Sequence, residues 1–164
     1  MPLTLDFIRD PGCSGDAFNR FCKNAQTNEV LYYCEANDSK LEIHRGDKYG
    51  PLIADTRSCP SSPGATDIRV LAAGNRNAHC HHDEDTRRTH FVKNGRKFSW
   101  KNRTQLVDDT GAVVAQMQSN SDPEDRRAGR LVINTEQDSK SLLDPIVMTA
   151  LMVQERSEED RSWF

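Results

Sequence analysis

The fold of this chain is decided by its most apolar stretch, which runs Leu142-Leu143-Asp144-Pro145-Ile146-Val147-Met148-Thr149-Ala150-Leu151-Met152-Val153. Asp144 suits an N-cap and Pro145 the first helical position, so the stretch predicts a helix over about residues 144–156. Its apolar side chains cover every side of that helix, which is typical of a helix buried all round. A helix of about 12 residues, roughly 18 Å long, is too short to span a bilayer. The charged residues 154–164 are expected to form a tail outside the core.

The rest of the chain predicts short strands separated by turn residues. Val30–Cys34 is rich in strand-forming side chains. Two hairpins are predicted, one turning at Asn94-Gly95, which favours a type I′ turn, and one turning at residues 108–111. Residues 16–23 are predicted to form one short helix, and residues 74–85 an exposed polar loop.

A mostly β chain with one fully apolar helix has few architectures open to it. No second helix layer exists to cover that helix, so the sheet must wrap around it. The sequence therefore predicts a mainly β protein, a closed antiparallel β-barrel around one hydrophobic C-terminal helix, as a single domain over residues 1–164. The net charge of −3 argues against a general nucleic-acid-binding protein.

The cellular compartment of the protein is inferred from its cysteines and its N-terminal residues. Residues 1–8 lack the basic and long apolar regions of a secretion signal. An odd number of irregularly spaced cysteines is typical of reduced thiols, so a cytoplasmic or nuclear protein is expected. The five cysteines are Cys13, Cys22, Cys34, Cys59 and Cys80.

A basic segment between residues 86 and 107 holds seven Lys or Arg residues and no acidic residue. Strand alternation places Phe98 and Trp100 on the inner face and Lys97, Lys101 and Arg103 on the outer face. Arg88 and His90 point outward on the paired strand if Phe91 points inward. Such a cluster raises the potential for a phosphate-bearing ligand; the alternative is a solvated surface balanced by acidic residues at its two ends. The candidate anion-binding residues are Arg88, His90, Lys97, Lys101 and Arg103.

A second cluster contains imidazole and thiol groups, which are ligands for zinc and copper. Adjacent residues of an extended strand point to opposite sides, so four consecutive side chains do not converge on one ion. His79 and His81 together with a distant residue such as His90 would do so, and the alternative is a polar loop. The candidate metal ligands are His79, Cys80, His81, His82 and His90. Cys80 is also the one cysteine whose histidine neighbours would lower its pKa.

The order of several segments resembles the C-terminal half of fungal proteins of the tubby C-terminal-like superfamily, which includes phospholipid scramblases and plant LURP-one-related proteins. The resemblance implies a barrel of about twelve strands around a hydrophobic helix. It also implies a link to membranes, since tubby domains bind phosphoinositides and scramblases are tied to membranes and calcium. The segments are Phe98-Ser99-Trp100-Lys101, Leu106-Val107-Asp108-Asp109, Val113-Val114-Ala115, Leu131-Val132-Ile133 and residues 142–151.

The function expected from these features is that of an intracellular, non-enzymatic binding module without a cofactor. Its partner is expected to be an anionic membrane surface, bound through phosphoinositide headgroups, or another protein; nucleic acid and a transmembrane segment are not expected. One alternative is a small-molecule-binding or enzymatic barrel with its site at a barrel mouth. Another is a protein–protein adaptor that uses the loops Pro11–Lys23 and Cys59–Thr66.

Overall fold

The computed structural model of the protein describes residues 2–12, 18–37, 40–58, 65–71, 79–83, 88–120, 122, 124–134 and 139–161. Twelve strands and one helix lie in these residues. The first six strands are β1 (Leu3–Arg9), β2 (Arg20–Asn24), β3 (Val30–Asn37), β4 (Lys40–Arg45), β5 (Leu52–Ser58) and β6 (Ala65–Val70). The remaining elements are β7 (His79–Asp83), β8 (Arg88–Lys93), β9 (Arg96–Lys101), β10 (Gln105–Val107), β11 (Val113–Ser119), β12 (Arg127–Ile133) and α1 (Ser139–Arg161).

The described strands form one closed antiparallel barrel in simple chain order. Each strand pairs with the next along the chain, and β12 returns to pair with β1. An ion pair supports this closure, because Arg130 Nε donates to Asp6 Oδ1 at 2.7 Å across the β1–β12 ladder. The predicted closed barrel is therefore confirmed.

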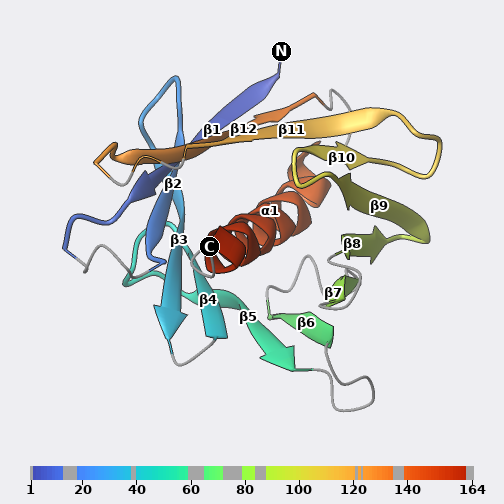
Figure 1. The fold of residues 1–164 in the computed structure, drawn as a ribbon, viewed down its shortest axis with the longest axis horizontal. Coiled ribbons are helices and arrows are strands. Elements are labelled where there is room, and N and C mark those ends of the chain that lie inside the picture. The colour runs from blue at the N-terminus through green and yellow to red at the C-terminus, as the bar shows by residue number, and fades with distance from the viewer. Residues whose placement is uncertain are drawn as a thin grey trace.

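Helix α1 runs through the inside of the barrel (Figure 1). Every residue from 144 to 154 is buried, which places all sides of this part of the helix against the strands. Apolar burial on all sides is the property that the composition of the stretch predicted. The described helical residues contain no segment long and apolar enough to cross a membrane.

The predicted ends of the helix were wrong. The helix begins at Ser139, so Asp144 and Pro145 lie inside it and not at its N-terminus. Asp144 is buried and serves as an acceptor for side chains of the barrel wall, which capping rules do not anticipate. At the other end α1 continues to Arg161, and Gln154 and Ser157 are buried, so the expected tail over 154–164 does not begin at Gln154. Residues 162–164 lie outside the described part of the chain.

Two further predictions are corrected by the strand assignments. The segment 16–23 was expected to be helical, but its described C-terminal part enters strand β2. The segment 74–85 was expected to be an exposed loop, but residues 79–83 form β7 with Cys80 and His82 buried. In both cases the strand is specified by pairing with neighbouring strands, which local sequence does not encode.

The predicted hairpin at Asn94-Gly95 is confirmed. Both residues have positive φ, 53° and 77°, as a type I′ turn requires. The turn joins β8 and β9, whose inward side chains Phe91 and Phe98 stack with ring centroids 4.7 Å apart. This hairpin carries most of the site described next.

Candidate anion-binding site

The site forms where strands β8 and β9 separate. Their backbone pairing runs from Lys93 and Arg96 to His90 and Ser99. The first two residues of β8 and the last two residues of β9 therefore do not pair with each other. Beyond Ser99, strand β9 pairs with β10 alone. The barrel wall is therefore open between the start of β8 and the end of β9, and helix α1 lies behind the opening.

A pocket of about 760 Å³ occupies this opening. Among the described residues, its wall contains five basic side chains, two imidazoles and no acidic side chain. All five predicted anion-binding residues line it, so the structure brings them together in one place. The lining residues are His82, Arg88, Thr89, His90, Lys97, Ser99, Trp100, Lys101, Asn102, Arg103, Val153 and Arg156.

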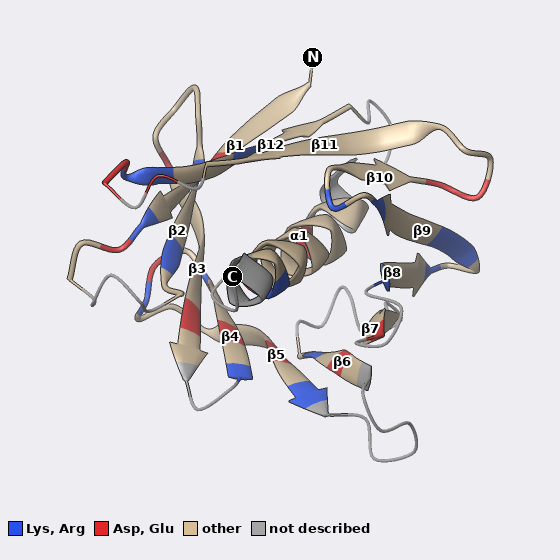
Figure 2. Cartoon of the chain, viewed as in Figure 1, with Lys and Arg blue, Asp and Glu red and all other residues tan. Residues whose placement is uncertain are grey.

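The described residues compensate the positive charge of the pocket only in part, since Arg156 Nε lies 3.5 Å from Glu155 Oε2. In that part of the chain no carboxylate lies within ion-pair distance of Arg88, Lys97 or Lys101. Figure 2 shows acidic residues in the turn between β10 and β11, and one of them, Asp108, pairs with Arg96 at 3.4 Å. Arg96 is not among the lining residues, so this carboxylate compensates charge outside the pocket.

The turn after β9 holds Arg103 in an unfavourable backbone conformation. Thr104 N–H donates to the Lys101 carbonyl at 3.1 Å, and the two central residues, Asn102 and Arg103, have φ of 53° and 60°. Asparagine tolerates this left-handed region, whereas a long side chain such as arginine costs about 1–2 kcal/mol there. The Arg103 guanidinium reaches Ser157 Oγ of α1 at 3.4 Å and lines the pocket. Strain of this kind clusters at functional sites.

The inner wall of the pocket is held by neutral hydrogen bonds. His82 Nδ1 lies 2.6 Å from Thr89 Oγ1, which ties β7 to β8. Trp100 Nε1 donates to Thr149 Oγ1 of α1 at 2.8 Å. These contacts orient the Trp100 and His82 rings. The positive charge of the pocket comes from its basic side chains.

Sequence reasoning missed Arg156, because residues 154–164 were assigned to a tail. Arg156 stands three positions after Val153, so both share one helix face, and both line the pocket. The Arg156 guanidinium also donates to Thr66 Oγ1 of β6 at 3.3 Å. The signal that would have found it is the continuation of helix-forming residues through Gln154 and Glu155.

His90 has a lowered pKa. Burial is the main cause, and the charge of Lys97 and the neighbouring His81 and His79 act in the same direction. The lowered pKa reduces the contribution of His90 to the positive charge of the pocket.

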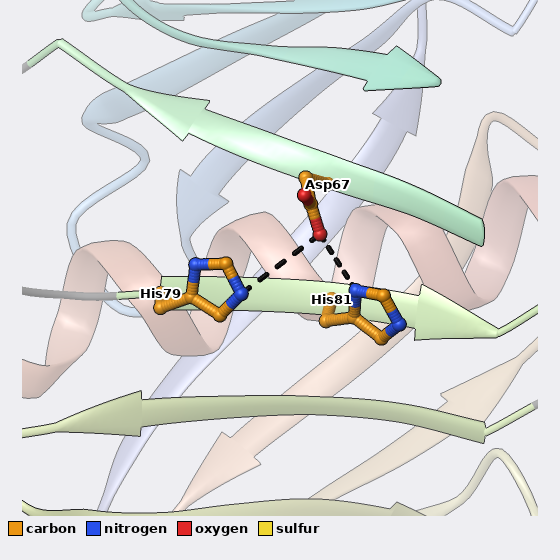
Figure 3. A group of neighbouring side chains, drawn as sticks. All are labelled: Asp67, His79 and His81. Atoms are coloured by element: carbon orange, nitrogen blue, oxygen red, sulfur yellow. Dashed lines mark hydrogen bonds and ion pairs between the residues drawn. The ribbon is translucent and has the colours of Figure 1, made fainter. Parts of the chain in front are cut away.

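The predicted metal ligands divide between the two faces of β7. His79 and His81 point outward, where they meet Asp67 of β6 (Figure 3). Cys80 and His82 point inward and are buried. Burial raises the pKa of Cys80 to about 12, so the expected lowering is wrong, and its thiol is poorly suited to nucleophilic catalysis or metal binding.

The alternative of a protein–protein adaptor gains little from the described residues. Residues 13–17 and 59–64, which make up much of the two candidate adaptor loops, lie outside the described part of the chain. The exposed large apolar side chains Tyr49, Leu71 and Val113 belong to three separate segments.

Fold and pocket together define a class of protein: a closed antiparallel β-barrel filled by its C-terminal helix, with a basic pocket through its wall. The chain belongs to the family of unknown function DUF6593, whose model matches residues 19–159. The matched region contains every residue that lines the pocket. Neither a curated protein nor a solved structure gives a significant match to this chain.

Proposed function

We propose that this protein is a non-enzymatic module that binds phosphate-bearing anions in the pocket between β8, β9 and α1, and that the physiological ligand is a phosphoinositide headgroup. The observation that carries the proposal is a pocket with five basic side chains from three segments of the chain and no acidic side chain among the described residues that line it. Three of these side chains, Arg88, Lys97 and Lys101, have no ion-pair partner among the described residues, and such a cluster of cations creates a positive potential that attracts multiply charged anions.

The size and chemistry of the pocket suit such a headgroup. A volume of about 760 Å³ lies within the range typical of small-molecule sites. Lys97 and Lys101 supply mobile ammonium groups, and Arg88, Arg103 and Arg156 supply guanidinium groups, which bind phosphate oxygens in pairs. The resemblance to the tubby C-terminal-like superfamily supports a lipid as the source of the phosphate. The cytoplasmic or nuclear side of a membrane is the proposed location.

Charge reversal of the two lysines tests the proposal. Lys97→Glu/Lys101→Glu is expected to weaken co-sedimentation with vesicles containing phosphatidylinositol bisphosphate by at least about 30-fold. This follows from about 1 kcal/mol of attraction per basic residue near an anionic surface. Wild-type binding is expected to fade between low and physiological salt. Soluble inositol trisphosphate, titrated calorimetrically, separates recognition of the headgroup from adsorption to the surface.

The matched control is Lys40→Glu/Lys48→Glu, which makes the same change in net charge at exposed positions outside the pocket. This control is expected to bind as wild type does. Absence of wild-type binding at both salt concentrations would refute the proposal, and so would equal binding by the two double variants.

Arg103→Gly separates the role of this side chain in binding from its role in folding. Glycine adopts the left-handed conformation without steric cost, which offsets its greater flexibility in the unfolded chain. The free energy of unfolding is therefore expected to stay within about 1 kcal/mol of wild type, while vesicle binding weakens about 5-fold through the lost cation. Urea unfolding and co-sedimentation measure the two quantities. A large loss of stability with unchanged binding would contradict a binding role for Arg103.

A further inference from the structure

A second group of chemically active side chains lies on the outer surface of the barrel, on neighbouring strands β6 and β7. His79 and His81 are two residues apart on β7 and therefore share a face, and Asp67 stands directly opposite His81 on β6. His81 Nδ1 lies 2.6 Å and His79 Nε2 lies 3.9 Å from the same oxygen, Asp67 Oδ1. Figure 3 shows both rings turned toward this carboxylate.

We propose that Asp67, His79 and His81 bind a divalent transition metal ion of the zinc type. One ligand atom from each residue lies within 4.8 Å of the other two. Zinc bonds of about 2.0–2.2 Å to nitrogen and oxygen require ligand atoms about 3.3–3.5 Å apart in a tetrahedral arrangement. The distance from Asp67 Oδ1 to His79 Nε2, 3.9 Å, is longer than this, and the distance to His81 Nδ1, 2.6 Å, is shorter. Ion binding therefore requires small rotations of the His79 side chain, which is 65% exposed, and of the Asp67 side chain, which is 32% exposed.

The ligand types select the metal. Two imidazoles and one carboxylate suit zinc, copper, nickel or iron, whereas calcium and magnesium prefer all-oxygen sites. On binding, each imidazole coordinates through one ring nitrogen and carries its proton on the other, and Asp67 coordinates as a carboxylate. Three protein ligands leave the fourth position to water.

Packing around the group favours this role. His81 pairs with His90 across β7 and β8, and their ring centroids are 5.4 Å apart. His79 and His81 have nearly parallel rings 6.3 Å apart. Contacts with Asp67 and His90 thus hold the His81 ring in place before any ion binds, which lowers the ordering cost of binding. Cys80 and His82 do not take part, because they point into the barrel.

Zinc titration of the untagged protein tests the proposal. The expected result is one equivalent of Zn²⁺ bound with micromolar or tighter affinity, and no binding of Ca²⁺ or Mg²⁺ at the same concentrations. His79→Asn/His81→Asn is expected to weaken zinc binding at least about 100-fold, since even residues that only orient a ligand are worth 10–100-fold. Visible spectra of the Co²⁺-loaded protein are expected to show nitrogen and oxygen ligation without a thiolate band.

A matched control comes from a second group on the barrel, Glu35, Glu42 and His44, whose ligand atoms also lie within 4.8 Å of one another. The Glu35→Gln/Glu42→Gln variant is expected to keep the zinc affinity of wild type. Circular dichroism checks that each variant is folded. Zinc binding only at millimolar concentration, or equal affinity in the His79→Asn/His81→Asn variant, would overturn the assignment.

Discussion

Leu151→Ala is expected to lower the free energy of unfolding by about 3–4 kcal/mol. Leu151 is fully buried at the middle of α1, where barrel strands surround the helix. Truncation removes the transfer free energy of the lost methyl groups and leaves a cavity that a closed barrel cannot collapse to fill. Urea unfolding followed by tryptophan fluorescence or circular dichroism measures the change, and the melting temperature is expected to fall by roughly 10 °C.

The matched control is Leu71→Ala, the same substitution at a side chain that is 38% exposed after β6. Its expected cost is below about 1 kcal/mol, since exposed apolar groups lose little on truncation. Equal costs at the two positions would show that α1 does not form the core of the folded protein.

Asp144→Ala is expected to destabilise the fold by about 2–3 kcal/mol. The buried carboxylate accepts a hydrogen bond from the Tyr32 hydroxyl of β3, and Arg45 Nη2 of β4 donates to its other oxygen at 2.6 Å. Burial and the nearby Asp144 raise the pKa of Tyr32, so its hydroxyl stays protonated as the donor. Removal of the carboxylate leaves that hydroxyl buried without its acceptor. Chemical unfolding of the variant gives the cost directly.

Arg45→Ala is the comparison for this second prediction. The Arg45 side chain is 47% exposed and the Asp144 side chain 6%, so water replaces much of what the guanidinium loses. Its expected cost is about 1 kcal/mol or less. If Arg45→Ala cost as much as Asp144→Ala, the ion pair and not the buried Tyr32 contact would hold α1 to β3 and β4.

The fold predictions that were confirmed rest on local sequence patterns that are compatible with a single local structure or architecture. Apolar residues on every side of one helix require an enclosing sheet, and Asn94-Gly95 favours one turn type. The strand β7 and the ends of α1 were missed for a different reason. His79–Asp83 has no apolar periodicity, and its strand is formed by pairing with β6 and β8. Propensity rules predicted that the helix begins at Asp144. In the structure Tyr32 and Arg45 contact the Asp144 carboxylate, which is a buried hydrogen-bond acceptor and not a cap.

The residues of the candidate sites were likewise predicted from the sequence only in part. Alternation along β8 and β9 correctly predicted that Arg88, His90, Lys97 and Lys101 share the face opposite Phe91 and Phe98. It did not predict Arg156, which joins them because α1 passes behind the opening in the wall. For the histidines, alternation correctly excluded four adjacent ligands, but the sequence did not point to Asp67, twelve residues before His79.

The sequence by itself therefore determined the architecture of this protein and the sign of charge on one of its hairpins. Both follow from properties of short segments, namely periodicity, turn chemistry and composition. The tertiary structure alone decided that β8 and β9 separate into a pocket, that Arg156 completes it, and that Asp67 stands beside two histidines. These contacts join residues far apart along the chain, and they depend on strand register and barrel closure, which no local pattern encodes.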